Sequence, residues 1–110
     1  MVNPNKYVNQ GKITGHIDDS LKALNISYEA NLLNNDGYNM IFDIIENLQG
    51  MLNEFGTMVN VRDMEDIADD ISDEIDRIHA ISVENGKGKA TVDVKKHLRK
   101  IASYFYAMAK

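Results

Sequence analysis

The stretch DMEDIADDISDEIDRIH, residues 63–79, decides the fold of this chain of 110 residues. Its apolar residues recur in steps of three and four, and at about 100° per residue this spacing places them on one side of a helix. That side consists of Met64, Ile67, Ala68, Ile71, Ile75 and Ile78. Eight carboxylates occur among the first fourteen residues and fill the remaining surface. The stretch therefore predicts an amphipathic helix with one side in a core and one strongly acidic face.

Three other segments repeat this helical spacing, and the four segments together predict an all-α protein. The chain contains a single proline, Pro4, and lacks the alternating pattern of half-buried β-strands. Thr14 is expected to cap the first helix, because a threonine side-chain oxygen can accept a hydrogen bond from a free amide of the first turn. The expected helices cover about residues 14–33, 38–55, 61–81 and 91–108.

Short, turn-forming stretches connect the expected helices. Residues 34–37, Asn-Asn-Asp-Gly, are expected to end the first helix, because Asn and Gly tolerate left-handed backbone conformations. Residues 84–88, Glu-Asn-Gly-Lys-Gly, are expected to form the turn after the third helix. Amphipathic helices joined in this way predict a small antiparallel, up-and-down four-helix bundle. In an alternative arrangement, dimerisation completes or extends the bundle.

The length of the chain indicates a single domain with one modest core. We expect residues 13–110 to form this helical-bundle domain and residues 1–12 to form a flexible N-terminal arm. Cysteine is absent, which excludes disulfides, thiolate metal sites and cysteine nucleophiles. The sequence shows neither an apolar run of about 18 residues nor the apolar core of a signal peptide. The protein is therefore expected to be cytoplasmic, without contact with a membrane.

The net charge of −5 conceals two regions of opposite sign. Residues 1–86 contain 16 acidic residues and 5 Lys or Arg, whereas residues 87–110 contain 7 Lys or Arg and only Asp93 as an acid. This polarity suggests electrostatic contact between the two regions, with a partner or with a second copy of the chain. The basic residues placed opposite the apolar stripe of the last helix are Lys95, Lys96, Arg99 and Lys100.

The acidic face of the third helix has several interpretations, of which a solvated surface is the simplest. A second interpretation is a binding surface for a cationic partner, which would be attracted by the complementary potential. The candidate partner-binding carboxylates are Asp66, Asp69, Asp70 and Asp73. A third interpretation is a site for Mg²⁺ or Ca²⁺, because carboxylates three or four residues apart project together. The stretch lacks the glycine and the alternating ligands of an EF-hand loop, and we expect no resident metal.

An enzymatic interpretation rests on a resemblance within residues 43–69. Asp43-x-x-Glu46, followed twenty residues later by Asp66-x-x-Asp69, resembles the motif of the all-α nucleotide pyrophosphohydrolases, the MazG-like and dimeric dUTPase-like enzymes. The resemblance implies that these four residues bind magnesium and that a nucleoside triphosphate is hydrolysed. Aspartate replaces glutamate at two of the three glutamate positions. The four side chains also point away from the apolar stripes of their helices, whereas metal ligands should converge in a groove.

Several apolar residues fall outside the stripes and need a second apolar surface. Ile26 and Leu33 lie seven residues apart on the far side of the first helix, and Phe42 lies outside the stripe of the second. Either the first helix is central in the bundle, or these residues form a patch for an oligomer or a target protein. The three histidines lie in separate helices and are most simply residues at the boundary between apolar and polar faces.

The leading prediction is a non-enzymatic acidic helical protein that works by binding another protein. It would be an adaptor, an inhibitor or a regulatory subunit, and we expect it to form a homodimer. One alternative is the pyrophosphohydrolase-like enzyme, the only interpretation that implies a cofactor, Mg²⁺. The other is a nucleic-acid-associated protein that uses the basic C-terminal helix. This last alternative is disfavoured because the acidic bulk of the chain would repel nucleic acid.

Overall fold

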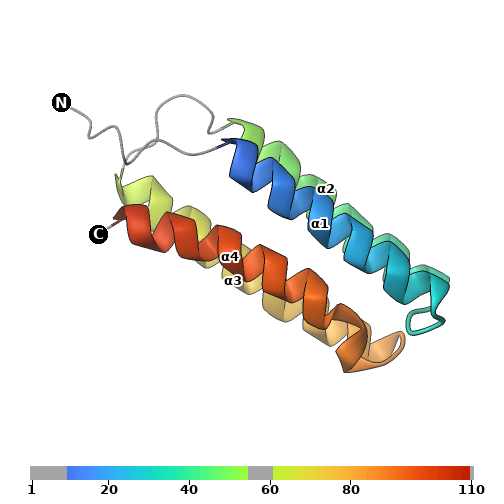
Figure 1. Ribbon diagram of the computed structural model, residues 1–110. Helices are drawn as coiled ribbons and strands as arrows, with labels where there is room; N and C mark the ends of the chain where they lie inside the picture. Colours follow the sequence, from blue (N-terminus) through green and yellow to red (C-terminus); the bar gives the residue numbers. More distant parts are fainter. Residues whose placement is uncertain (1–9, 55–60, 110) are drawn as a thin grey trace.

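The computed structural model describes residues 10–54 and 61–109, in which four α-helices pack against one another (Figure 1). Residues 1–9 of the predicted arm lie outside the described residues, whereas residues 10–12 already belong to the first helix. Thr14 is therefore inside this helix and is not its N-cap. The predicted all-α four-helix bundle is confirmed. The helices are α1 (Gln10–Glu29), α2 (Asn35–Glu54), α3 (Val61–Glu84) and α4 (Val92–Ala109).

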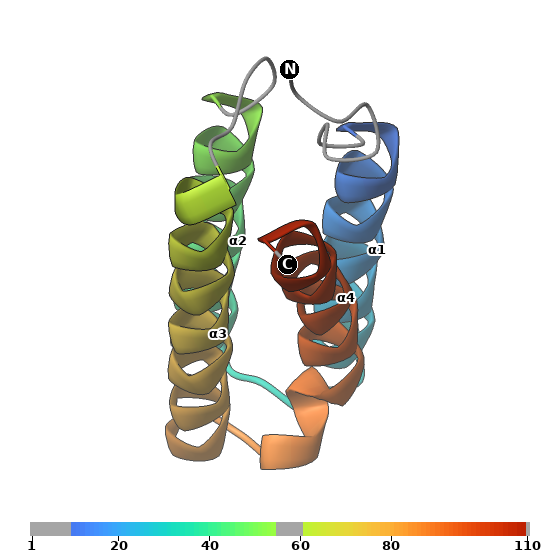
Figure 2. The same cartoon turned by 90° about the vertical axis from the view of Figure 1, so that its left-hand side faces the viewer.

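The helices follow one another in an up-and-down order, so that each runs antiparallel to the one before it (Figure 1). Contacts join α1 to α2, α2 to α3, α3 to α4, and α4 back to α1. Figure 2 shows α2 and α3 on one side of the bundle and α1 and α4 on the other. The contact between α3 and α4 is the most extensive of the four, and the contact between α2 and α3 is the least extensive.

The core is built from residues three or four apart on every helix, as the periodicity predicted. On α3, all six residues of the predicted apolar stripe are buried. Each fully buried Ile or Leu side chain contributes roughly 1.5–3 kcal/mol to folding. The largest side chains that are completely enclosed are Phe105, Ile17, Leu24, Ile41, Ile45, Leu52, Met64, Ile71, Ile78, Leu98, Ile101 and Val94.

Helix α1 ends earlier than the sequence suggested, and Asn31 is the reason. Its φ of 62° lies in the left-handed region, which Asn tolerates better than most residues. The amide of Asn31 donates to the carbonyl of Tyr28, and the amide of Leu32 donates to the carbonyl of Ser27, both at 3.0 Å. This is the Schellman pattern that ends a helix. The prediction that residues 34–37 end α1 was therefore wrong.

Asn34 begins α2. Its side-chain Oδ1 accepts a hydrogen bond of 2.8 Å from the amide of Gly37, and its carbonyl accepts one from Tyr38. The side-chain bond is the geometry of an N-cap, which satisfies one of the free amides of the first turn. Asparagine suits both a helix end and a helix start, and the sequence pattern alone does not distinguish the two.

The α1–α2 turn and the turn after α3 lie at the same end of the bundle and are joined by backbone hydrogen bonds (Figure 1). The amide of Asn34 donates to the carbonyl of Asn85 at 2.9 Å, and the amide of Lys87 donates to the carbonyl of Leu32 at 3.1 Å. Leu33 and Gly86 thereby form an isolated antiparallel bridge. A short 3₁₀-helix, η2 (Gly88–Thr91), then leads into α4.

The bridge between the turns buries Leu33, which is only 4% exposed and belongs to the hydrophobic core. Of the two alternatives for Leu33, the external patch beside Ile26 was therefore wrong, and its candidacy as a partner-binding residue falls with it. The physical reason is that α1 stops at Glu29, so that helical periodicity no longer governs the direction of the Leu33 side chain.

Candidate functional site

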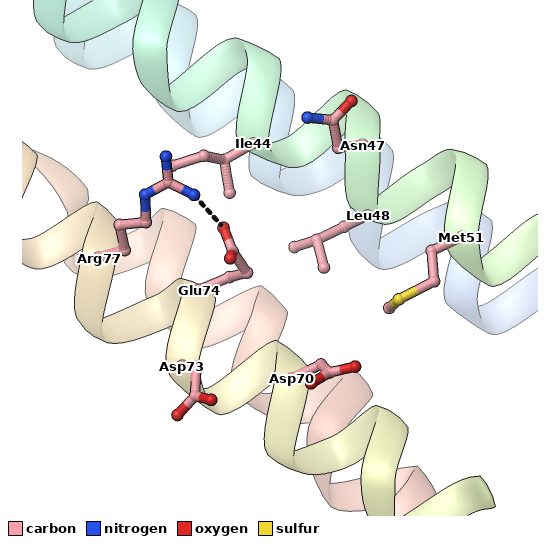
Figure 3. Close-up of a pocket in the computed structure, with 8 residues that line it drawn as sticks. All are labelled: Ile44, Asn47, Leu48, Met51, Asp70, Asp73, Glu74 and Arg77. Atoms are coloured by element: carbon pink, nitrogen blue, oxygen red, sulfur yellow. Dashed lines mark ion pairs between the residues drawn. The ribbon is translucent and has the colours of Figure 1, made fainter.

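A groove of about 270 Å³ lies between α2 and α3, the two neighbouring helices with the least extensive contact (Figure 3). From α2, Ile44, Leu48 and Met51 follow one another at helical spacing and form its apolar floor. Leu48 and Met51 point toward α3, as Figure 3 shows. The floor is anchored in the core, because Ile44 and Leu48 are themselves buried. The remaining lining residues are Asn47 of α2 and Asp70, Asp73, Glu74 and Arg77 of α3.

The rim of this groove on α3 is acidic. It carries three carboxylates and the Arg77 guanidinium, which sum to a charge of −2. Arg77 forms an ion pair of 3.5 Å with Glu74, three residues earlier on the same helix. Such an exposed pair contributes little to stability and can rearrange when a partner arrives. The groove thus combines an apolar floor with a negatively charged edge.

The other candidate carboxylates of α3 do not share this surface. Asp69 faces α4, because the Tyr106 hydroxyl donates a hydrogen bond of 2.6 Å to its Oδ1. This bond raises the pKa of Tyr106 above its ordinary value of 10.0. Asp66 is exposed on the outer side of the helix. Of the four predicted partner-binding carboxylates, only Asp70 and Asp73 line the groove.

The four residues of the pyrophosphohydrolase-like motif are not brought together within one chain. Asp43, Glu46, Asp66 and Asp69 are all exposed, and Asp69 is turned toward α4 rather than α2. Within residues 10–54 and 61–109, three metal-ligating side chains approach one another in only one place, and none of these four belongs to that group. The geometry of the single chain therefore gives the motif no support as a magnesium site.

Lys95 was expected on the basic outer face of α4, and this placement was wrong. The side chain is only 6% exposed, and its Nζ lies 2.8 Å from Nδ1 of His79 on α3. Lys95 precedes Leu98 by three residues and Ala102 by seven, so that it lies on the flank of the buried stripe. Burial, and next the charge of Arg99, lowers the pKa of Lys95. The exposed basic face of α4 is thereby reduced to Lys96, Arg99 and Lys100.

The apolar residues predicted to form a second patch have different environments. Ile26 is 66% exposed, whereas Leu33 is buried between the turns. Phe42 is half-buried and lies against Tyr38 with their ring centroids 5.9 Å apart. Tyr38 in turn contacts Tyr28, at 4.7 Å. Tyr38 thus covers part of Phe42, and Ile26 is the one member of the three that is exposed.

Sequence reasoning missed a cluster formed by His16 and Asp19 of α1 and His97 of α4. The histidines were treated separately and Asp19 was not singled out, because Asp19 and His97 are 78 positions apart in the sequence and only the packing of α1 against α4 brings them together. Burial, then the nearby charges of Lys100 and His97, lowers the pKa of His16 below its ordinary value of 6.5. The one signal in the sequence was that His16 and Asp19 are three residues apart on one helix.

Comparison of the chain with protein-family models, with curated proteins and with solved structures found no match. Among the described helices, none combines the length and the apolar character that crossing a lipid bilayer requires.

Proposed function

We propose that this protein works by binding another protein and that the groove between α2 and α3 receives a cationic amphipathic helix of that partner. The observation that carries the proposal is the union of an apolar floor and an acidic rim in one groove (Figure 3). A helix laid into such a groove would present apolar residues at three- and four-residue spacing to the floor. Its Lys or Arg residues would face the carboxylates of α3.

The residues of the floor suit such a partner. Met51 is partly buried and unbranched, so that its side chain can adapt to partners of different shape. Leu48 and Ile44 are held by the core and provide a fixed surface beneath it. Burial of partner side chains against these residues would supply affinity, because each buried methylene contributes about 0.8 kcal/mol.

The charged rim would supply orientation and speed of association more than affinity. Asp70 and Asp73 are exposed, so that their attraction for a cationic helix should weaken as salt increases. An adaptor, an inhibitor and a regulatory subunit are all roles for a protein of this kind. We also propose that the protein forms a homodimer. The sedimentation coefficient of the free protein, measured at several concentrations, tests this proposal.

The test is a titration of the ¹⁵N-labelled protein with a synthetic amphipathic peptide of leucine and lysine, followed by amide chemical shifts. We expect the largest shift changes along residues 44–51 and 70–77, with little change on α1. A leucine and glutamate peptide of the same length should cause no comparable change. Shift changes spread evenly over all four helices, or confined to a face outside the groove, would contradict the proposal.

A charge-matched pair of variants makes the test specific. The triple variant Asp70→Asn, Asp73→Asn, Glu74→Gln removes three negative charges from the rim, and we expect it to weaken peptide binding by about tenfold or more. The control variant Asp18→Asn, Glu29→Gln, Glu84→Gln removes the same charge from exposed positions outside the groove. An equal loss of affinity in the two variants would show that only the net charge matters, and the groove would then have no specific role.

A further inference from the structure

A second candidate site lies on the opposite flank of the bundle, where α1 packs against α4. One ligand atom each of His16, Asp19 and His97 lies within 4.8 Å of the other two. His16 and Asp19 are three residues apart and therefore project from the same face of α1, toward His97 on α4. This is the one group of three metal-ligating side chains in the part of the chain that the structure describes.

The two imidazoles have unused ligand atoms. Nδ1 of His16 and Nδ1 of His97 are both buried, and neither has a hydrogen-bond partner among the described residues. The two rings lie side by side with their centroids 6.0 Å apart. Neither nitrogen is engaged by another described side chain, so both can act as ligands. A metal ion can accept electron pairs from both nitrogens at once.

The surroundings of His16 suit a metal ligand as well. Its Nε2 lies 3.5 Å from the hydroxyl of Tyr104, and the two rings are 5.8 Å apart. If Nδ1 binds the metal, Nε2 carries the ring proton and can donate a hydrogen bond to the hydroxyl oxygen of Tyr104. Metal-bound histidines commonly hold their second nitrogen in such a hydrogen bond, which orients the ring.

The composition of the cluster selects the class of metal. Two imidazoles and one carboxylate suit zinc and related transition-metal dications, whereas Mg²⁺ and Ca²⁺ prefer shells of oxygen ligands. Ligand atoms around a tetrahedral zinc are about 3.4 Å apart, given bonds of about 2.1 Å, so small side-chain rotations from the present arrangement would suffice.

We propose that His16, Asp19 and His97 form a binding site for a zinc-class dication that links the first helix of the bundle to the last. Water would complete the coordination, because three protein ligands leave one position of a tetrahedron open. Metal bound there would stabilise the folded chain by mass action, since the unfolded chain does not hold the three ligands together. The site is separate from the groove between α2 and α3 and does not depend on it.

The first experiment uses the full chain without an affinity tag, because histidine tags bind the same metals. Isothermal titration with Zn²⁺ should show one site per chain, and the unfolding temperature should rise with Zn²⁺ and not with Mg²⁺. Cobalt substitution reads the geometry, because tetrahedral Co²⁺ absorbs visible light much more strongly than octahedral Co²⁺. Absence of stoichiometric Zn²⁺ binding would overturn the proposal.

Matched variants assign the ligands. We expect His97→Gln to weaken Zn²⁺ binding by about a hundredfold or more, and Asp19→Asn by about tenfold. Asp18→Asn removes the same charge from the neighbouring exposed position and should leave affinity unchanged. His79→Gln, which removes the histidine outside the cluster, should also leave it unchanged. Equal effects of Asp18→Asn and Asp19→Asn, or Zn²⁺ binding that survives His97→Gln, would overturn the assignment.

A measurement on the unaltered chain covers the case in which a variant does not fold. Imidazole ¹⁵N shifts should move at His16 and His97 on addition of Zn²⁺ and stay constant at His79. The competing occupant is an anion, because Arg99, Lys100, Ser103 and Tyr104 line a cavity of about 420 Å³ together with His16. If inorganic phosphate raised the unfolding temperature and Zn²⁺ did not, the cluster would be a binding site for an anion and the metal proposal would be overturned.

Discussion

A Cβ atom on Gly86 would lie 2.0 Å from the carbonyl oxygen of Leu32, in the turn between α1 and α2. The same carbonyl accepts the hydrogen bond from Lys87, and the neighbouring bond from Asn34 to Asn85 holds the two turns at this separation. The turns therefore act as one unit that fastens the α1–α2 hairpin to the α3–α4 hairpin. Glycine is required at residue 86 because of this close approach.

Gly86→Ala should lower the free energy of unfolding by about 2–3 kcal/mol, because the backbone of one turn must move to admit the methyl group. Gly50→Ala is the matched control. A Cβ at residue 50 would meet nothing within 4 Å, and alanine is the better helix former, so this change should raise stability by about 0.5–1 kcal/mol. Urea unfolding of both variants measures the difference. Similar effects of the two substitutions would show that the turns are not held together in solution.

Asn31 should be replaceable by glycine but not by alanine. The backbone of residue 31 is in the left-handed conformation, which is about 1–2 kcal/mol unfavourable for most residues with a Cβ atom. The penalty is smaller for Asn and Gly. We expect Asn31→Ala to reduce the free energy of unfolding by about 1 kcal/mol and Asn31→Gly to leave it unchanged or raise it slightly. Urea unfolding of the two variants is the measurement. If alanine were as stable as glycine at this position, α1 would have to end differently in solution.

These turns show where sequence reasoning succeeds and where it fails. The apolar period of α3 predicted six buried residues of this helix correctly, because burial of a helix face follows directly from local spacing, but it gave no sign of the buried Ser82. Asn34 was assigned to the wrong helix, since the same side chain suits a helix end and a helix start. Asp70 and Asp73 were predicted as partner-binding candidates and line the groove, but their apolar neighbours on α2 were assigned only to the core.

Long-range packing accounts for the larger failures. Lys95 lies one position from the buried Val94, and only the approach of His79 on α3 turns its ammonium group inward. The cluster of His16, Asp19 and His97 depends on which helices become neighbours. Periodicity describes each helix by itself and carries no information on the register between helices.

The burial of Lys95 predicts an alkaline dependence of stability. Because its pKa in the folded chain is lower than the ordinary 10.5, the unfolded chain binds more protons between these two values. The contribution of Lys95 to the free energy of unfolding should therefore rise as the pH increases through this window and level off near 10.5. Below the window the charged ammonium is held in a buried position at a cost.

Lys95→Met should remove this dependence. At neutral pH the variant should be more stable by about 1 kcal/mol, since an apolar side chain of similar volume replaces a buried charge. The advantage should shrink as the pH approaches 10.5. Urea unfolding of both proteins at pH 7 and at pH 10 checks both statements. The pKa of Tyr106 is raised, which gives stability the opposite pH dependence, but this contribution cancels in the difference between the free energies of unfolding of the two proteins. A constant advantage at every pH would contradict the inward placement of the ammonium group.

The acidic face of α3 should cost stability, and salt should relieve part of this cost. Asp66 has carboxylates three or four residues away at Asp63, Asp69 and Asp70, and one cation, Arg62, four residues before it. Each pair at these spacings contributes about 0.2–0.5 kcal/mol, so the repulsion exceeds the attraction. Asp66→Asn should therefore raise the free energy of unfolding by about 0.5 kcal/mol at low ionic strength, and by less in about 0.2 M NaCl, where the charges are screened. Asp93→Asn is the control with the opposite sign, because Asp93 in the first turn of α4 interacts favourably with the helix dipole. Urea unfolding of both variants at two salt concentrations tests the pair. A loss of stability in Asp66→Asn would show that attraction from a cationic neighbour outweighs the repulsion among the carboxylates of α3.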